Sequence, residues 1–220
     1  MSGPAATPFR VVLLGPPASG KGTQGQFLAH ALGLGYLSTG ALLREQVENQ
    51  TPLGKLAGPI LARGEYLPDD LMCPIIAQWL LSQHTGWVLD GFPRSLPQAV
   101  FLDQWLTQNH QVLTAAVSLE VAKDKLLARI QERVECPSCR WSGQRSELTP
   151  SNLCPVCQSP ASSRADDSEQ NFRSRHAEFV TLTQPVINHY RLTGKLLPID
   201  GSVPQADVAA KILSSFPHPA

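Results

Sequence analysis

The sequence has few charged side chains and no excess of either sign. Of its 220 residues, 18 are Lys or Arg and 18 are Asp or Glu, so the formal net charge is zero. A protein that binds nucleic acid or an anionic membrane through a general electrostatic field carries a surplus of basic residues, which this chain lacks. We therefore expect no nucleic-acid or membrane partner, and any bound anion must be held by a local group of cations.

Long hydrophobic runs are also missing. No stretch of 18 apolar residues occurs, so the sequence predicts no membrane-spanning helix. The opening MSGPAATPFR has neither an apolar stretch nor an arginine-rich amphipathic pattern, which predicts a loose tail on a cytosolic protein, and the Pro-rich FPHPA predicts a second loose tail. Apolar residues still make up 42% of the chain, enough to bury a sizeable core.

Short apolar runs alternate with helix-like segments along the chain. Residues 11–14, 87–89, 113–119 and 196–199 have the pattern of buried strands, and residues 34–37 are a further candidate. The segments between them are mostly helical in pattern. This alternation predicts an α/β fold with a parallel sheet.

A glycine-rich stretch, GPPASGK from Gly15 to Lys21, follows the first apolar run and precedes a helical pattern over residues 23–34. It fits G-x-x-x-x-G-K, whose backbone N–H groups surround a phosphate while the lysine reaches the outer phosphates. The N-terminus of the next helix adds a partial positive charge. Gly22 stands where Ser or Thr commonly follows the lysine, with Thr23 one place later. An ordinary Gly/Pro turn is the alternative, and the loop alone predicts only a nucleoside phosphate.

A carboxylate, Asp90, follows the strand predicted at residues 87–89. In a parallel sheet this position lies at the carboxyl edge beside the phosphate loop, where a carboxylate can organise Mg²⁺ and its waters. An ordinary loop aspartate is the alternative.

Four of the five cysteines form two C-P-x-C knuckles, Cys136/Cys139 and Cys154/Cys157. They lie in residues 136–163, where the aliphatic periodicity is lost, which indicates an inserted subdomain. Four thiolates at this spacing are typical of a structural zinc site with no open position for a catalytic water. Disulfides are the alternative, and iron could replace zinc. Only two arginines lie between the first and last knuckle cysteine, which disfavours a nucleic-acid-binding ribbon.

Four motifs, GPPASGKGT, STGALLR, DGFPRSLPQA and RADDSEQNFRSR, together resemble those of adenylate kinases, in the long form whose lid carries a four-cysteine zinc site. The resemblance covers nearly the whole chain. It implies a P-loop nucleoside monophosphate kinase with a parallel sheet wrapped by helices. The implied core is residues 9–37, 68–132 and 170–216, with an AMP-binding segment at 38–67 and a zinc-binding lid insertion at 133–169.

The same resemblance implies a cytoplasmic, monomeric enzyme that transfers a phosphoryl group reversibly from MgATP to AMP, giving two ADP, and so maintains adenine nucleotides. The implied catalytic residues are Lys21, Arg94, Arg133, Arg164 and Arg175. Those implied for ATP are Gly15, Pro16, Ala18, Ser19, Gly20, Lys21, Gly22, Thr23 and Arg129. Those implied for AMP are Thr39, Gly40, Arg44, Glu65, Leu67, Gly91, Arg94, Gln98, Arg164 and Arg175. Ala18 departs from the glycine of many relatives, and Ala41 from an aspartate that is frequent in the family.

Phosphoryl transfer needs positioned cations more than a catalytic base, because the acceptor phosphate is already mostly ionised at neutral pH. The six histidines are therefore interpreted as structural or surface residues. Thr39 and Gln98 favour adenine at the acceptor site, whereas GTP as donor, or another nucleoside monophosphate kinase acting on UMP or CMP, remains an alternative. A zinc-ribbon nucleic-acid-binding protein with a vestigial nucleotide site is an alternative of another class.

The motif RADDSEQNFRSR also carries a helix-start pattern. Asp166 or Asp167 is expected to cap a helix that begins near Glu169. Its apolar side is expected to consist of Phe172, Phe179 and Leu182. Closure of the lid would then bring the arginines on either side of this helix start to one phosphate chain and exclude water.

Overall fold

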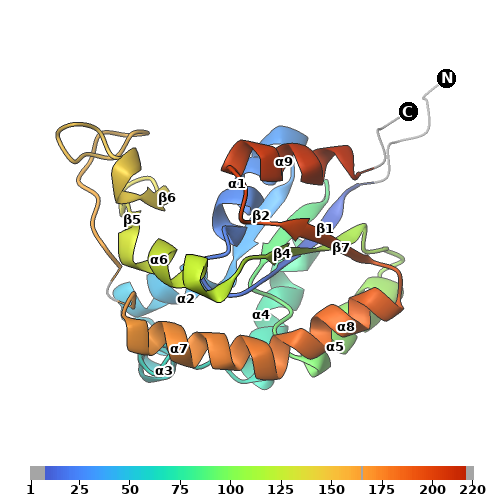
Figure 1. Cartoon of the computed structure of the whole chain (residues 1–220). Coiled ribbons are helices and arrows are strands. Elements are labelled where there is room, and N and C mark those ends of the chain that lie inside the picture. Colours follow the sequence, from blue (N-terminus) through green and yellow to red (C-terminus); the bar gives the residue numbers. More distant parts are fainter. Residues whose placement is uncertain (1–7, 165, 217–220) are drawn as a thin grey trace.

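Five parallel strands form the sheet at the centre of the molecule (Figure 1). The structure, a computed structural model, describes residues 8–164 and 166–216. In chain order the strands are β1 (Arg10–Leu14), β2 (Gly35–Ser38), β3 (Trp87–Asp90), β4 (Ala115–Glu120) and β7 (Leu196–Asp200), and their order across the sheet is β2-β3-β1-β4-β7. All five predicted strands are therefore confirmed, including the candidate at residues 34–37.

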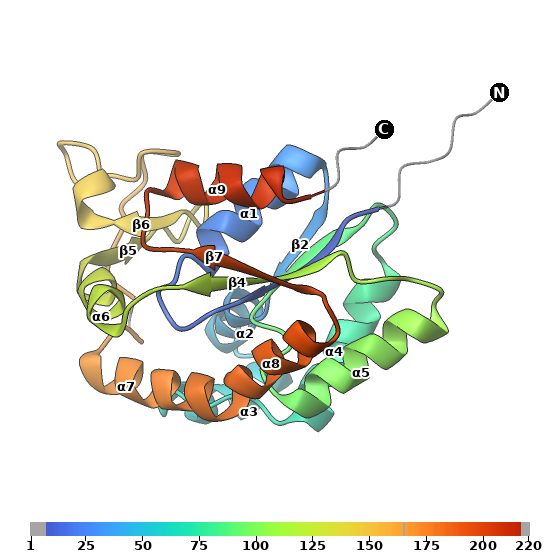
Figure 2. The same cartoon turned by 45° about the vertical axis from the view of Figure 1, so that its right-hand side comes forward.

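Helices cover both faces of this sheet, as the two views in Figures 1 and 2 show. Helices α1 (Lys21–Leu32) and α9 (Gln205–Ser214) lie on one face; α4 (Asp69–Leu81), α5 (Leu96–Gln108) and α8 (Gln184–Leu192) lie on the other. Because strand side chains alternate in direction, Val11 and Leu13 of β1 pack under α1 and α9, and Val12 and Leu14 pack into the opposite core. Within the described residues, no helix is long and apolar enough to cross a membrane.

The two expected loose ends fall mostly on residues 1–7 and 217–220, which lie outside the described residues. The described residues at each end pack against the rest of the molecule, so the prediction of loose tails is wrong for these residues. The rings of Phe9 and Phe216 have centroids 5.3 Å apart, and Phe216 is only 6% exposed. Both rings complete the apolar layer under α1 and α9, since burial of an aromatic side chain outweighs the cost of ordering a few terminal residues.

Two short helices leave the carboxyl edge of the sheet as a pair. Helices α2 (Thr39–Glu48) and α3 (Pro52–Ala62) pack against one another and fill most of residues 38–67. Each begins at a hydroxyl cap: the side chain of Ser38 accepts a hydrogen bond from the N–H of Ala41, and that of Thr51 accepts one from the N–H of Gly54. Caps of this kind fix where each helix starts, and so fix the direction in which α2 presents its side chains.

A small subdomain follows helix α6 (Lys123–Glu132) and projects beyond the sheet (Figure 1). It contains the antiparallel strands β5 (Arg133–Glu135) and β6 (Ser142–Gln144), a 3-10 turn at Arg145–Glu147, and the four knuckle cysteines. Strand β6 lies against α1, so the subdomain sits close over the phosphate loop. This segment is hereafter called the lid.

Helix α7 (Glu169–Glu178) returns the chain from the lid, and its predicted cap is wrong. Ser168 caps it instead, with its side chain accepting a hydrogen bond from the N–H of Asn171. A wide π turn at Phe179–Thr183 joins α7 to α8 without a break. The wide turn changes the helical register, so Phe172 and Phe179 are buried as expected while Leu182 is 36% exposed, contrary to expectation.

Candidate active site

A cavity of about 830 Å³ opens at the carboxyl ends of the strands, between the phosphate loop, α2 and the lid. This size is at the upper end of the range for ligand pockets. Eight cationic side chains line it: Lys21, Arg44, Arg94, Arg129, Arg133, Arg140, Arg164 and Arg175. The lining carboxylates are Asp90, Glu135 and Glu147. The excess of cations suits a ligand that carries several negative charges.

The phosphate loop connects β1 to α1, as the sequence predicts. Positive φ angles at Gly15 (145°), Ala18 (63°) and Gly20 (97°) curl the backbone. Alanine takes such a conformation at a cost of roughly 1–2 kcal/mol, which glycine avoids. The ammonium of Lys21 lies inside this curl, where Nζ donates hydrogen bonds to the carbonyl oxygens of Gly15 (2.7 Å) and Pro16 (2.8 Å).

The position of Lys21 changes its acidity. Burial lowers the pKa of Lys21 to about 8; the charge of Asp90 opposes this shift, and nearby arginines, Arg94 foremost, reinforce it. A phosphate bound in the loop would add negative charge beside the ammonium and restore its protonated form.

Asp90 ends β3 and is 8% exposed. The hydroxyl of Tyr36, on the neighbouring strand β2, donates a hydrogen bond to Oδ2 of Asp90 at 3.2 Å. Burial and the charge of Asp90 raise the pKa of Tyr36, so the hydroxyl keeps its proton and remains a donor. The apolar pattern at residues 34–37 predicts a strand but not this hydrogen bond, because the bond depends on which strands are neighbours in the sheet.

The carboxylate of Asp90 fits a magnesium site. Mg²⁺ prefers oxygen ligands and is commonly held by one or two carboxylates together with substrate phosphates. Asp90 supplies one carboxylate beside the phosphate loop. Thr23, whose hydroxyl is a further oxygen, lines the same cavity.

Arg94 is held from several sides at the rim next to α2. Its Nε donates to the carbonyl oxygen of Gly91 at 2.6 Å, and Nη2 lies 3.4 Å from Oγ1 of Thr39. Its guanidinium stacks over the ring of Tyr66, 4.4 Å from the centroid. These contacts orient the arginine before any ligand arrives.

Arg175 enters the same cavity from α7. Burial lowers its pKa to about 10, an effect opposed by the charge of Asp166 and reinforced by neighbouring arginines. Its Nη1 donates to Oδ2 of Asp166 at 3.2 Å.

Several residues that the resemblance assigns to AMP lie outside the cavity wall. Thr39 is 2% exposed, and its hydroxyl bonds to the backbone carbonyl of Gly91. The amide of Gln98 donates to Asp69 at 2.7 Å and accepts from the N–H of Arg94 at 2.8 Å. Leu67 is buried, and Glu65 pairs with the exposed Arg63. Of the residues assigned to ATP, Pro16 is not part of the cavity wall. The remaining assigned residues of both nucleotide sets line the cavity, and the roles of all of them stay predictions.

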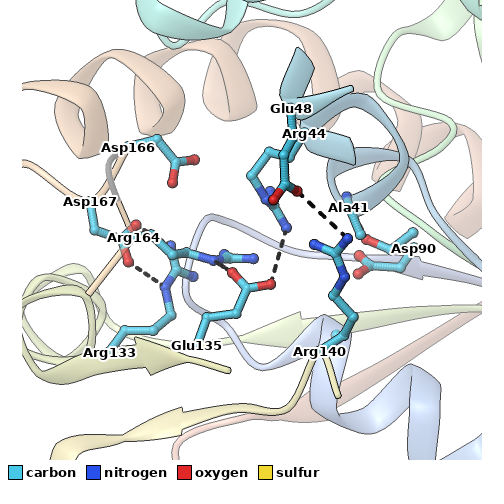
Figure 3. Close-up of polar contacts among 12 residues, drawn as sticks. Ala41, Arg44, Glu48, Asp90, Arg133, Glu135, Arg140, Arg164, Asp166 and Asp167 are labelled. Atoms are coloured by element: carbon cyan, nitrogen blue, oxygen red, sulfur yellow. Dashed lines mark hydrogen bonds and ion pairs between the residues drawn. The ribbon is translucent and has the colours of Figure 1, made fainter. Parts of the chain in front are cut away.

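Acidic partners of the lid arginines were missed by sequence reasoning (Figure 3). Nε of Arg133 donates to Oδ2 of Asp167 at 2.7 Å, and Arg164 donates to Glu135. The adjacent carboxylates Asp166 and Asp167 could have indicated partners for these arginines. From the sequence they are interpreted instead as caps of the next helix.

The four knuckle cysteines converge within the lid, and the first of them directly follows β5. Their Sγ atoms lie within 4.8 Å of one another, with 3.4 Å between Cys136 and Cys157 and 3.6 Å between Cys139 and Cys154. A tetrahedral zinc with Zn–S bonds of about 2.3 Å requires sulfur atoms about 3.8 Å apart. The N–H of Val156 points to Sγ of Cys154 at 3.4 Å, as expected of a knuckle. The cysteines are free thiols and fit a tetrahedral metal site.

A glycine-rich loop at the edge of a parallel sheet, facing arginines from a separate lid, defines a P-loop protein that binds nucleoside phosphates. The comparison with protein families agrees: the adenylate kinase model matches residues 13–195. The chain is 37% identical to an adenylate kinase of Zymomonas mobilis over 210 residues, covering 93% of this chain and 94% of the relative. It is 36% identical to adenylate kinases of Petrotoga mobilis (94% and 99% covered) and Thermotoga petrophila (92% and 94%). This chain belongs to the adenylate kinase family.

The pKa of Lys21 predicts proton uptake on nucleotide binding. At pH 8.5 a lysine of pKa about 8 is mostly neutral, and phosphate binding should restore its charge, taking up about 0.5–0.8 proton per site. Nucleotide phosphates are fully ionised at this pH, so they contribute no uptake. Isothermal titration of ATP in buffers of different ionisation enthalpy measures the proton count. Lys21→Met should reduce it nearly to zero; an unchanged count in that variant would assign the proton to another group.

Proposed function

We propose that this chain catalyses the reversible transfer of the γ-phosphoryl group of MgATP to AMP, giving two ADP, and so maintains the balance of adenine nucleotides. The observation that carries this proposal is the convergence on one cavity of Lys21 from the phosphate loop, Arg44 from α2, Arg94 from the loop after β3, and the lid-side arginines. Membership of the adenylate kinase family supports the same reaction.

The transfer breaks one P–O bond and forms another. The bond between the γ phosphorus and the β–γ bridging oxygen breaks, the β-phosphate leaves with that electron pair, and an α-phosphate oxygen of AMP attacks the γ phosphorus. No proton has to be removed from this acceptor when it is ionised, so the reaction does not require a catalytic base. The charge that spreads over the γ oxygens needs cations placed beforehand, and the cavity provides them.

The two nucleotides take opposite halves of the cavity in this proposal. The phosphate loop, with Arg129 and Arg133, holds ATP. Arg44, Arg94 and the α2 start hold AMP. Arg164 and Arg175 meet the phosphates between them, and closure of the lid excludes the water that would otherwise compete as acceptor.

Mg²⁺ and zinc belong to the proposal in different roles. Bound with ATP, Mg²⁺ neutralises phosphate charge, and Asp90, oriented by Tyr36, is the carboxylate that would hold it through its water shell. Zinc at Cys136, Cys139, Cys154 and Cys157 would hold the lid together, since few apolar side chains are buried there.

The setting of the enzyme is proposed on similar grounds. Four thiols at one metal site stay reduced most readily in a reducing compartment, which favours the cytoplasm. Residues of a single chain line the cavity with eight cations, which supports a monomeric enzyme.

The donor–acceptor assay tests the reaction directly. Purified protein with MgATP should form ADP from AMP much faster than from CMP, UMP or GMP, and replacement of ATP by GTP tests the donor. Lys21→Met should lower turnover by roughly 10²–10³-fold, equivalent to ~3–4 kcal/mol. Lys211→Met, an exposed lysine on α9, is the matched control and should retain full activity. Turnover of Lys21→Met within tenfold of the unmodified enzyme would remove the role assigned to this lysine.

The acceptor site is tested by Arg44 and Arg94. Because a guanidinium makes charge-assisted hydrogen bonds that alanine cannot replace, Arg44→Ala should raise KM for AMP far more than KM for ATP. Arg94→Ala should also lower kcat, since Arg94 lies beside β3 and the phosphate loop. Steady-state kinetics with each nucleotide varied in turn separates the effects. A rise in the ATP constant alone for Arg44→Ala would mean that the two sites are exchanged.

The zinc site is expected to be structural. Replacing Cys154 and Cys157 with serine should release about one metal ion per chain and lower the melting temperature, because metal binding here contributes folding energy. Cys73→Ala, at the fifth cysteine, should keep the metal. Metal analysis and thermal melts measure both effects. Activity well below the melting point should largely survive; its loss while the lid remains folded would point to a direct role in catalysis.

A further inference from the structure

Glu135 places a carboxylate in a cavity whose lining charges are mostly positive. It ends strand β5 at the base of the lid, and its side chain is 16% exposed. One oxygen accepts a hydrogen bond from Nε of Arg164, and the other lies 3.9 Å from Nη2 of Arg44 (Figure 3). A single carboxylate thus contacts Arg44, to which the proposed function assigns the AMP phosphate, and Arg164, which it places between the phosphates of the two nucleotides.

The backbone of Glu135 is held in place from the opposite arm of the lid. Its N–H donates to the carbonyl oxygen of Ser162 at 2.8 Å, and the N–H of Ser162 donates back to the carbonyl oxygen of Glu135 at 3.1 Å. On the other side it pairs with Ser142 of β6. The side chain can therefore rotate away from the arginines, but the residue cannot withdraw from the cavity rim without breaking both pairings.

The surrounding charges explain why a carboxylate is stable there. Arg44 is partly buried, and burial together with the charge of Arg164 lowers the pKa of Arg44, while the charges of Glu135 and Asp166 oppose this shift. For Arg164, burial also lowers the pKa, but the hydrogen bond and charge of Glu135, together with the charges of Asp166 and Asp167, outweigh it and raise the value overall. Two desolvated cations close together need an anion between them.

The other acidic groups near this cluster form their ion pairs with other arginines, although the charges of both also act on Arg164, and that of Asp166 also acts on Arg44. Asp167 pairs with Arg133, and Asp166 with Arg175, all within the lid and its return helix. Ala41, which lines the cavity on α2, adds only a methyl group. Among the ion pairs of residues 8–164 and 166–216, Glu135 is thus the partly buried carboxylate that joins α2 to the lid.

A second bridge between α2 and the lid is much more exposed. Arg140 lies 3.8 Å from Glu48, with side chains 44% and 65% exposed (Figure 3). Solvent screens such a pair, and its contribution is small. The ionic contact between α2 and the lid therefore depends mainly on Glu135.

We propose that Glu135 is a positioning residue that limits the affinity of the acceptor site: its carboxylate holds Arg44 and Arg164 together and competes with the AMP phosphate for their N–H groups. Carboxylate and phosphate oxygens accept the same charge-assisted hydrogen bonds from a guanidinium. AMP must therefore displace at least the contact with Arg44, and the carboxylate that remains nearby repels the phosphate. The proposal rests on the proposed function, because it takes Arg44 as an acceptor-site residue.

Glu135→Gln tests this competition, because it removes the charge and keeps the size of the side chain. The dissociation constant for AMP, measured by isothermal titration without a donor nucleotide, should fall roughly tenfold, and the gain should shrink as salt is raised. The constant for MgATP should change less. Glu132→Gln is the matched control: it makes the same charge change three residues earlier, at an exposed position on α6, and should leave both constants unchanged.

A double-mutant cycle with Arg44→Ala separates this proposal from the one it rests on. The effect of Glu135→Gln on AMP affinity should be smaller when Arg44 is absent. If Arg44→Ala leaves AMP affinity unchanged, the acceptor site itself is wrongly placed. If Arg44→Ala weakens AMP binding but Glu135→Gln does not strengthen it, the competition proposed for Glu135 is wrong.

Folding is checked in the same series. Thermal melts show whether Glu135→Gln is folded at the titration temperature. If it is not, Glu135→Asp keeps the charge but shortens the side chain by one methylene, and it should tighten AMP binding to a smaller extent. AMP binding that is unchanged or weaker in the folded variant would instead make Glu135 an organiser of the arginines and overturn the proposal.

Discussion

The central physical constraint in this structure is the concentration of positive charge around one partly buried cavity. Burial first, and then repulsion between neighbouring guanidinium groups, lowers the pKa of Arg44 and Arg175. The protein offsets this cost locally, with a carboxylate or a backbone carbonyl beside most of the cations. The same arrangement makes the site selective for polyanions, because each local partner is weaker than a phosphate chain that contacts several arginines at once.

The distribution of these cations over separate elements follows from the chemistry. A rigid cavity lined by many cations would be costly to fold and slow to admit two nucleotides. Here the phosphate loop is fixed on the sheet, Arg44 is on the α2–α3 pair, and the lid carries Arg133 and Arg164. Each of these elements contributes only a few of the charges that line the cavity. The lid can be small because four sulfur ligands around a metal can take the place of an apolar core.

The sequence predicts what depends on local pattern and misses what depends on packing between distant segments. The five strands, the phosphate loop and the two cysteine knuckles follow from residues close together in the chain, and the structure confirms the strands, the loop's strand-to-helix setting and the clustering of the sulfurs. The hydrogen bond from Tyr36 to Asp90 depends on strand order, which periodicity does not encode. Ser168 rather than Asp167 caps α7 because Arg133 already engages the Asp167 carboxylate, and no local rule predicts that competition.

The contact between Phe9 and Phe216 brings the two ends of the described chain to the same place, beneath α1 and α9. Strand β1 starts there, so this place is at the amino edge of the sheet, opposite the cavity at the carboxyl edge. A short linker between these two points would span little distance, and new ends could then be opened in an exposed loop elsewhere. The geometry would therefore allow circular permutation, which changes the order of the elements along the chain while keeping the arrangement that forms the cavity.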